Sequence, residues 1–123
     1  MKKKKLDELT PEQLAARFAE AALIQYDALL DNDIPKYNRV YDLLVEVDQE
    51  LRKRDPEARL ALLSLYKHTN IQVRLEAASF TAGVAPKLAR KLLQEIKDSQ
   101  DFPQAGDAGM AIRALDSGEW KPT

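Results

Sequence analysis

Residues 70–84 read NIQVRLEAASFTAGV, and this stretch decides the fold because its apolar side chains fall on two opposite sides of a helix. On a helical wheel with about 100° per residue, two roughly opposite stripes are both apolar. One stripe holds Ile71, Leu75, Ala78 and Ala82, and the other holds Val73, Ala77, Phe80 and Val84. A surface helix needs only one such stripe. We therefore expect this helix to lie between two layers of neighbours.

Two long amphipathic segments precede this stretch. Thr10, Pro11 and Gln13 form a strong start signal with the pattern of a capping box, and the helical pattern continues to about residue 30. A second helix is predicted from residue 34 to about residue 53. Because the connection between them is short, we expect these two helices to pack as an antiparallel hairpin.

Three further helices are predicted beside the central one, at residues 56–66, 86–97 and 104–116. Asp55 and Pro56 stop one helix and begin the next, and Gly118 can take the left-handed conformation that ends the last. No segment alternates apolar and polar residues as a strand would. The sequence therefore predicts an all-α fold of about six helices in one domain, residues 1–123.

The overall charge offers little attraction for nucleic acid or anionic lipid. The chain has 19 basic and 20 acidic residues, a net charge of −1. Its one basic run, residues 2–5, is followed by polar residues rather than the apolar core of a signal peptide. We expect residues 1–8 to be a disordered basic terminus, and we expect no membrane span. The absence of cysteine fits a reducing cytoplasm, which we take as the expected location.

An imperfect repeat runs through the second half of the chain. Pro56 and the Leu62-Leu63 pair recur 30 residues later as Pro86 and the Leu92-Leu93 pair, as in stacked helical hairpins. The run from Asn70 through Val73 and Arg74 to the following alanines resembles the second-helix signature of HEAT-type repeats. Residues 9–120 also resemble a small bacterial family of domains of unknown function. The resemblance implies an α–α superhelix built of HEAT-like hairpins.

Two residues of the central helix are expected to act structurally. Asn70 stands where it can cap the helix. Arg74 projects between the two apolar stripes, and HEAT-type repeats use the matching arginine to bridge to an acidic group of an adjacent unit. Asp107 is the expected partner, since a desolvated arginine must be paired to be tolerated.

The residues needed for catalysis or metal binding are sparse. His68 is the only histidine, it lies in a predicted turn, and there is no cysteine to complete a metal set. There is no Gly-rich phosphate loop and no nucleophile elbow. We therefore expect no catalytic residue, no cofactor and no metal, and we expect that the protein is not an enzyme.

A polar strip on the central helix is the predicted contact surface. It runs along Gln72, Glu76, Ser79 and Gly83, and we expect it to be small and open to solvent, with Gln72, Glu76 and Ser79 as the candidate contacts. Tyr37 and Tyr41, one turn apart on the second helix, are the other candidates. These tyrosines either pack half-buried or anchor a partner, as tyrosines often do in interfaces.

These features favour a non-enzymatic module that binds a protein partner. Some small helical-repeat domains of bacteria are similar to immunity or antitoxin proteins, which adds a dedicated partner to the expectation. The alternative is a nucleic-acid-binding HEAT-like domain. The predicted strip contains Glu76 and no basic residue, so nucleic acid is the less favoured partner.

Overall fold

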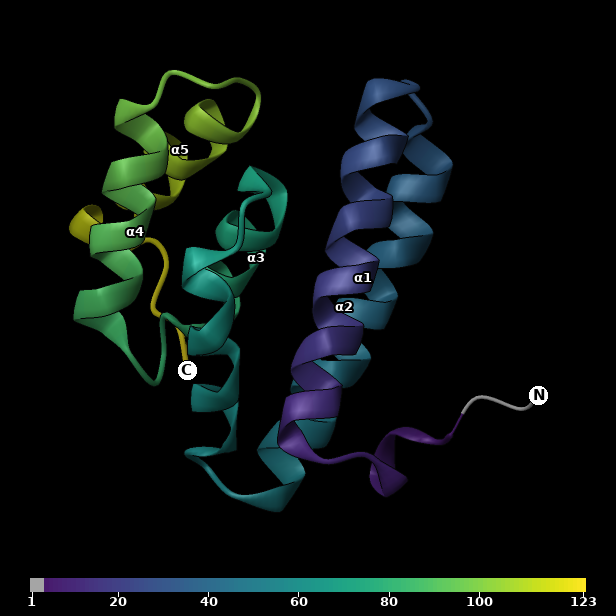
Figure 1. Cartoon of the computed structure of the whole chain (residues 1–123). Coiled ribbons are helices and arrows are strands. Elements are labelled where there is room, and N and C mark those ends of the chain that lie inside the picture. The colour runs from purple at the N-terminus through teal and green to yellow at the C-terminus, as the bar shows by residue number, and fades with distance from the viewer. Residues whose placement is uncertain (1–3) are drawn as a thin grey trace.

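The structure is a computed structural model that describes residues 4–123. Over that range the chain forms five α-helices and two 3₁₀ helices joined by loops (Figure 1). They are η1 (Leu6–Glu8), α1 (Pro11–Leu30), α2 (Ile34–Arg54), η2 (Ala58–Lys67), α3 (Ile71–Thr81), α4 (Pro86–Asp98) and α5 (Gln104–Ser117). The predicted all-α fold is confirmed, with α1, α2, η2, α3, α4 and α5 as the six helices. None of the helices in these residues combines the length and the apolar character that a membrane span requires.

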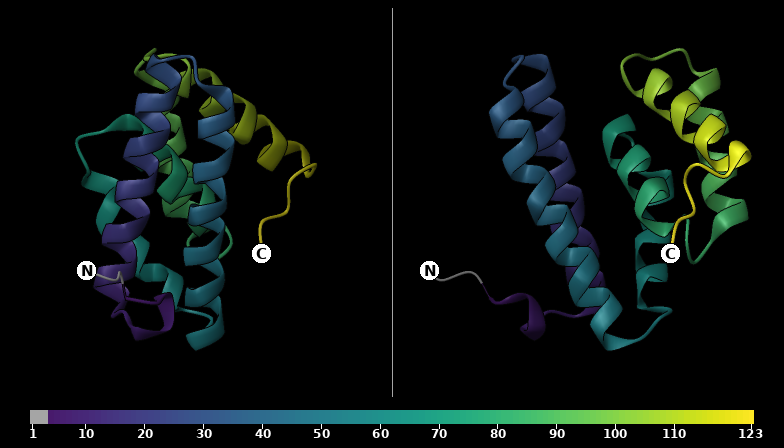
Figure 2. Two further views of the ribbon diagram at one scale, coloured as in Figure 1. Left: turned by 90° about the vertical axis from the view of Figure 1, so that its right-hand side faces the viewer. Right: turned by 180° about the vertical axis from the view of Figure 1, so that it is seen from behind.

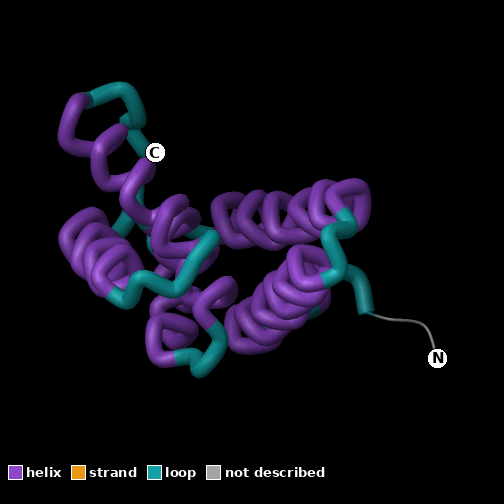
Figure 3. The backbone as a smooth tube through the Cα atoms, turned by 90° about the horizontal axis from the view of Figure 1, so that it is seen from above, coloured by secondary structure: helices purple, strands orange, loops and turns teal. Residues whose placement is uncertain are grey.

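The helices pair as hairpins that lie side by side. The α1–α2 hairpin forms one side of the molecule, α4 and α5 form the other, and η2 with α3 lies between them (Figure 1). Figure 2 shows the same order from behind, and Figure 3, seen from above, shows only helix and loop in the described chain. The arrangement is an α–α superhelix in which α3 occupies the middle.

Side-chain caps begin the helices where the sequence places them. Thr10 Oγ1 accepts from Gln13 N at 3.1 Å and Gln13 Oε1 accepts from Thr10 N at 2.9 Å, which completes the capping box of α1. Asn70 Oδ1 accepts from the N–H groups of Gln72 and Val73, at 2.8 and 3.2 Å, and so caps α3 as predicted. The central helix ends at Thr81, three residues earlier than residue 84, because the chain turns there before α4 begins.

The third helix differs from its predicted form. Residues 58–67 form a 3₁₀ helix rather than an α-helix. Its buried residues, Arg59, Leu62 and Leu65, are spaced three apart. With three residues per turn, this spacing brings all three onto one face, which packs inward. Arg59 is therefore buried on the same face of the helix as Leu62 and Leu65.

Part of the N-terminus is ordered, contrary to the expectation for residues 1–8. Residues 6–8 form η1, and Leu6 packs against the apolar cluster of α1 and α2. The Leu6 carbonyl accepts from Arg54 Nη2 at 2.9 Å, and the Lys4 carbonyl accepts from Arg17 Nη1 at 3.1 Å. These hydrogen bonds hold the segment against α1 and α2. Because they join residues that are far apart in the chain, no local sequence pattern predicts them. Residues 1–3 lie outside the described residues, so the prediction for them stays a prediction.

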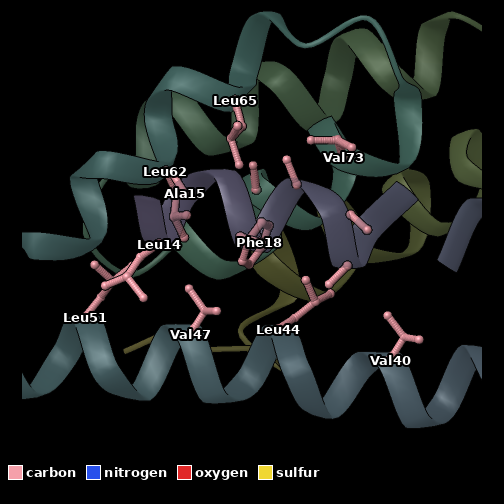
Figure 4. Packing of buried hydrophobic residues seen from close by; sticks show 14 of the residues in the cluster. Leu14, Ala15, Phe18, Val40, Leu44, Val47, Leu51, Leu62, Leu65 and Val73 are labelled. Atoms are coloured by element: carbon pink, nitrogen blue, oxygen red, sulfur yellow. The ribbon is translucent and has the colours of Figure 1, made fainter. Parts of the chain in front are cut away.

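Two apolar clusters form the core, and α3 belongs to both. The first lies among α1, α2 and η2, where Figure 4 shows Leu14 and Phe18 of α1 beside Leu44 and Val47 of α2. The second lies among α3, α4 and α5. From α3, the first cluster receives Val73, Ala77 and Phe80, and the second receives Ile71, Leu75 and Ala78 together with Ala82, the residue that follows the helix. The two-sided pattern is therefore confirmed up to Ala82, and Val84 lies in the turn beyond.

Because α3 is common to both clusters, the chain is expected to unfold as one unit. Leu44→Ala in the first cluster and Leu93→Ala in the second, both at 0% exposure, should each lower the free energy of unfolding by about 2–5 kcal/mol. Each variant should show a single transition in urea, measured by circular dichroism. Matched controls are Leu43→Ala and Leu88→Ala, whose side chains are about half exposed and should cost much less. Two separate transitions in either core variant would contradict the shared-helix arrangement.

Candidate functional site

Three glutamines from three helices form a buried polar seam. Gln72 of α3 donates from Nε2 to Gln25 Oε1 of α1 at 3.2 Å and accepts at Oε1 from Gln104 Nε2 of α5 at 3.0 Å. The Gln72 amide also lies 3.5 Å from the hydroxyl of Tyr37 on α2. Because a buried polar group without a partner costs about 1–3 kcal/mol, this seam favours one orientation of the four helices.

The predicted contact strip of Gln72, Glu76 and Ser79 is not open to solvent. Gln72 is 1% exposed and Glu76 is 7% exposed, while Ser79 is half-buried. The helical wheel places the three residues on one polar side of α3, but it does not show which neighbour covers that side. Gln72 is buried between Gln25 and Gln104 in the seam. Glu76 and Ser79 line a neighbouring cleft.

The cleft, which we call the α2–α3 cleft, has a volume of about 400 Å³. It is bounded by α2, η2, the end of α3 and residues 119–123, which we call the tail. Its lining is mainly polar and contains both acidic and basic side chains. The lining residues are Tyr41, Asp48, Arg52, Arg59, Glu76, Ser79, Phe80, Gly83 and Trp120 through Thr123.

Several charged groups in the cleft have unused hydrogen-bonding capacity. Asp48 is 6% exposed and binds Arg52 Nε through Oδ2 at 2.8 Å, but its Oδ1 has no partner. Arg59 is 5% exposed, and its Nε and Nη1 have no partner within the described chain. Glu76 Oε2 is also buried and unpartnered among these residues. Buried polar atoms are normally satisfied, so this concentration marks the cleft as a candidate ligand site.

The tail runs back from the end of α5 (Figure 2). Its residues 120–123 line one side of the cleft. The Trp120 side chain packs against the second apolar cluster, and its backbone N–H donates to the Ala114 carbonyl at 3.0 Å. Thr123 accepts two hydrogen bonds, one from Arg59 Nη2 to its main-chain oxygen at 2.9 Å and one from Arg52 Nη1 to its hydroxyl at 3.2 Å. The tail also needs a glycine at position 83, since a Cβ there would clash with the backbone of Thr123.

Burial dominates the electrostatics of Glu76. Desolvation raises the pKa of its carboxyl from the ordinary 4.5 to about 7; the nearby Gln25 amide opposes this increase and the charge of Asp107 adds to it. Burial and the charges of Glu76 and Asp48 also raise the pKa of Tyr41. Glu76 can therefore change its protonation state near neutral pH without leaving the wall of the cleft.

The structure separates the two predicted tyrosines. Tyr41 lines the cleft, is 42% exposed and packs its ring against Phe80 with centroids 5.9 Å apart. Tyr37 is half-buried beside Gln72. Tyr41, Glu76 and Ser79 thus meet at the cleft, whereas Tyr37 and Gln72 belong to the seam.

Arg74 does not form the predicted ion pair with Asp107. Its Nε is buried without a hydrogen-bond partner in the described part of the chain. Arg74 and Glu76 are about 200° apart around α3. Asp107 lies on the Glu76 side, where its charge raises the pKa of Glu76. The predicted pair therefore falls on different sides of the helix.

Sequence reasoning missed Asp48, Arg52, Arg59 and the tail. Asp48 carried a usable signal, because it follows Leu44 by four residues and precedes Leu51 by three, on the buried stripe of α2. Arg59 stood among leucines with the three-residue spacing of a 3₁₀ helix. For the tail, no local pattern pointed to the cleft.

Comparison with known proteins gives one family and one solved structure. Residues 12–116 match the family described as Domain of unknown function (DUF2019). The chain is also similar to the crystal structure of the protein RPA1889 from Rhodopseudomonas palustris CGA009, with 47% sequence identity and a TM-score of 0.93. That match covers 98% of this chain and 100% of the other. No curated protein matches the sequence.

The raised pKa of Glu76 predicts a specific pH dependence of stability. Between its unfolded pKa near 4.5 and its folded pKa of about 7, the folded state binds the proton that the unfolded state has lost. The free energy of unfolding should therefore fall as pH rises across this window, by about 3 kcal/mol from this group, and its contribution should level off above it.

Glu76→Gln should remove this contribution, measured as urea unfolding at pH 5 to 8. Glu46→Gln, a substitution of an exposed glutamate on α2, is the matched control and should keep the wild-type profile. A Glu76→Gln profile parallel to that of the wild type would contradict the raised pKa.

Proposed function

This chain belongs to the family described as Domain of unknown function (DUF2019), and we propose that it is a non-enzymatic protein-binding module. Its α2–α3 cleft would hold an extended segment of a partner protein. The observation that carries the proposal is that one wall of the cleft is itself a non-helical polypeptide segment, the tail, held by side chains of α2 and η2. The tail is bound through its backbone as well as its side chains, since the main-chain oxygen of Thr123 accepts from Arg59 at 2.9 Å.

The hairpin architecture supports a HEAT-like assignment as part of this proposal. α1–α2, η2–α3 and α4–α5 are successive hairpins, and each packs chiefly on its neighbours in sequence. Repeat proteins of this kind bind partners on a surface formed between successive units. The cleft lies between the first two hairpins, which is where such a surface is expected.

The chemistry of the cleft favours binding over catalysis. Ser79 Oγ donates to the Leu75 carbonyl at 2.9 Å, and Asp48 is engaged by Arg52. The single histidine, His68, accepts at Nδ1 from the Asn70 N–H at 3.0 Å in the turn before α3. None of these described contacts places a nucleophile beside a free base, which acyl or phosphoryl transfer would require.

A protein partner is also better supported than nucleic acid. The cleft contains the carboxyl groups of Asp48 and Glu76 together with Arg52 and Arg59. A nucleic-acid surface is expected to gather basic residues along a phosphate backbone, without carboxylates between them. Mixed charge with an exposed aromatic ring, Tyr41, is more typical of a protein interface.

The test is capture of a partner from the native lysate by the full-length chain, with proteins identified by mass spectrometry. A partner that uses the cleft should be recovered near stoichiometry by the wild type. Arg59→Met should reduce its recovery at least about tenfold, because losing charge-assisted hydrogen bonds costs about 1.5–3 kcal/mol. Arg39→Ala, which removes an exposed arginine of α2, is the matched control and should bind normally.

Two outcomes would contradict the proposal. A partner retained equally by wild type and Arg59→Met would place the binding surface elsewhere. Salt-sensitive recovery of nucleic acid that survives deletion of residues 1–5 would favour the alternative function.

A further inference from the structure

We propose that the partner segment places a basic side chain, a lysine or an arginine, at the end of the α2–α3 cleft that Tyr41 and Glu76 form. The inference rests on the proposed function, because it names the chemistry of that partner. We call this end of the cleft, with the side chains beside it, the acidic subsite. It comprises the carboxyl groups of Glu76 and Asp107 and the phenol rings of Tyr37 and Tyr41.

Three helices bring these side chains together. The glutamine seam holds α2, α3 and α5 at one level, with α3 between the other two (Figure 1). Tyr41, Glu76 and Asp107 each follow the seam residue of their own helix by three or four residues, about one turn. The charge of Glu76 raises the pKa of both tyrosines, and the charge of Asp107 raises the pKa of Glu76 and Tyr37. The four side chains therefore form one cluster.

Glu76 supplies a buried carboxyl group that lacks a partner. Its side chain lines the cleft, the residue is 7% exposed, and Oε2 has no hydrogen-bond partner in the described chain. Within residues 4–123, neither Glu76 nor Asp107 forms an ion pair. A buried carboxylate is costly unless a positive charge and hydrogen bonds compensate it. A basic side chain bound here would supply both.

The arginines of the cleft gather at its other end. Arg52 is paired with Asp48 at 2.8 Å, and the charges of both act on Arg59. Asp48 and Arg52 follow Tyr41 on α2 by 7 and 11 residues, which is about 10 and 16 Å along the helix. The cleft thus has a basic end and an acidic end. A positively charged side chain of the partner is directed to the acidic end.

The aromatic rings favour an organic cation over a metal ion. Tyr41 is 42% exposed, and its ring is supported by Phe80 with centroids 5.9 Å apart. The face of such a ring attracts an ammonium or guanidinium group that lies within about 6 Å. A hard metal ion such as Ca²⁺ takes about six to eight oxygen ligands. The described residues contain no group of three or more His, Cys, Asp or Glu side chains that could hold a metal.

The groups around Glu76 make its ionisation sensitive to a bound cation. Asp107 of α5 is acidic, Gln25 of α1 is neutral, and α2 contributes the two phenols. Arg59 of η2 belongs to the basic end, and Lys121 of the tail is exposed. A cation that binds beside Glu76 stabilises the ionised carboxylate, so it should lower the pKa of this group from about 7 toward 4.5.

The experiment uses the full-length chain and two simple cations. Butylammonium stands for a lysine side chain and butylguanidinium for an arginine side chain, and both keep their charge at neutral pH. The control is 1-butanol with sodium chloride at the same concentration, which matches the apolar chain and the ionic screening. The pKa of Glu76 is measured by NMR of its carboxyl carbon, whose signal is identified by its loss in Glu76→Gln.

At saturation, the cation that binds better should lower the pKa of Glu76 by at least about one unit. This shift corresponds to a tenfold preference of the cation for the ionised carboxyl group. The stronger of the two cations identifies the partner's side chain as lysine or arginine. An equal shift with the control, or an unchanged pKa with both cations, would overturn the inference.

Variants test the site itself. Glu76→Gln keeps the shape of the side chain but removes its charge, and it should weaken binding of the cation at pH 8 at least about tenfold, followed by the ring signals of Tyr41. Glu46→Gln, at an exposed position of α2, is the matched control and should bind as the wild type does. Tyr41→Leu, followed by the Glu76 signal, should weaken binding about two- to fivefold. Equal binding by Glu76→Gln and the wild type contradicts the inference.

The outcomes separate this inference from the proposed function. If Arg59-dependent partner capture is found but neither cation lowers the pKa of Glu76, the acidic subsite is wrong and the binding module remains. If the cations act on Glu76 but capture does not depend on Arg59, the acidic subsite is supported and the placement of the partner along the whole cleft is wrong.

Discussion

The structure depends on one constraint, which is that α3 must bury two opposite faces. Val73 and Ala77 belong to the core with α1 and α2, while Leu75 and Ala78 belong to the core with α4 and α5. A helix of 11 residues with apolar residues on both sides cannot lie at a surface without exposing one of them. The other hairpins are therefore held on either side of it, and the order of the layers follows.

Sandwiching a helix also determines what happens to its polar side chains. Gln72 cannot reach solvent, so its amide is satisfied by Gln25 and Gln104 from the flanking layers. Glu76, one turn later, has no such set of partners, and burial raises its pKa. One turn of α3 thus contributes Gln72 to the hydrogen-bonded seam. The next turn contributes Glu76, an ionisable side chain with an unpartnered oxygen, to the wall of the cleft.

The cleft combines residues that are remote in sequence, and this explains which of them were predictable. Tyr41, Glu76 and Ser79 stood out because each occupied a recognisable position on its own helix. Arg59 and the tail are 64 residues apart at the Arg59–Thr123 hydrogen bond, and no local pattern links them. The error over solvent exposure has the same origin, since a helical wheel defines a direction but not the neighbour that lies there.

The sequence by itself determined the all-α class, the helix starts at Thr10 and Asn70, and the two-sided packing of the central helix. Each of these follows from helix capping or from the 3.6-residue helical period. Capping and periodicity depend only on residues that are close together in the sequence. Only the tertiary structure decided that residues 58–67 form a 3₁₀ helix, that Gln72 is buried in a seam and that Arg59 meets the tail. These features depend on which surfaces come together, and packing between distant segments is not contained in the periodicity of any one of them.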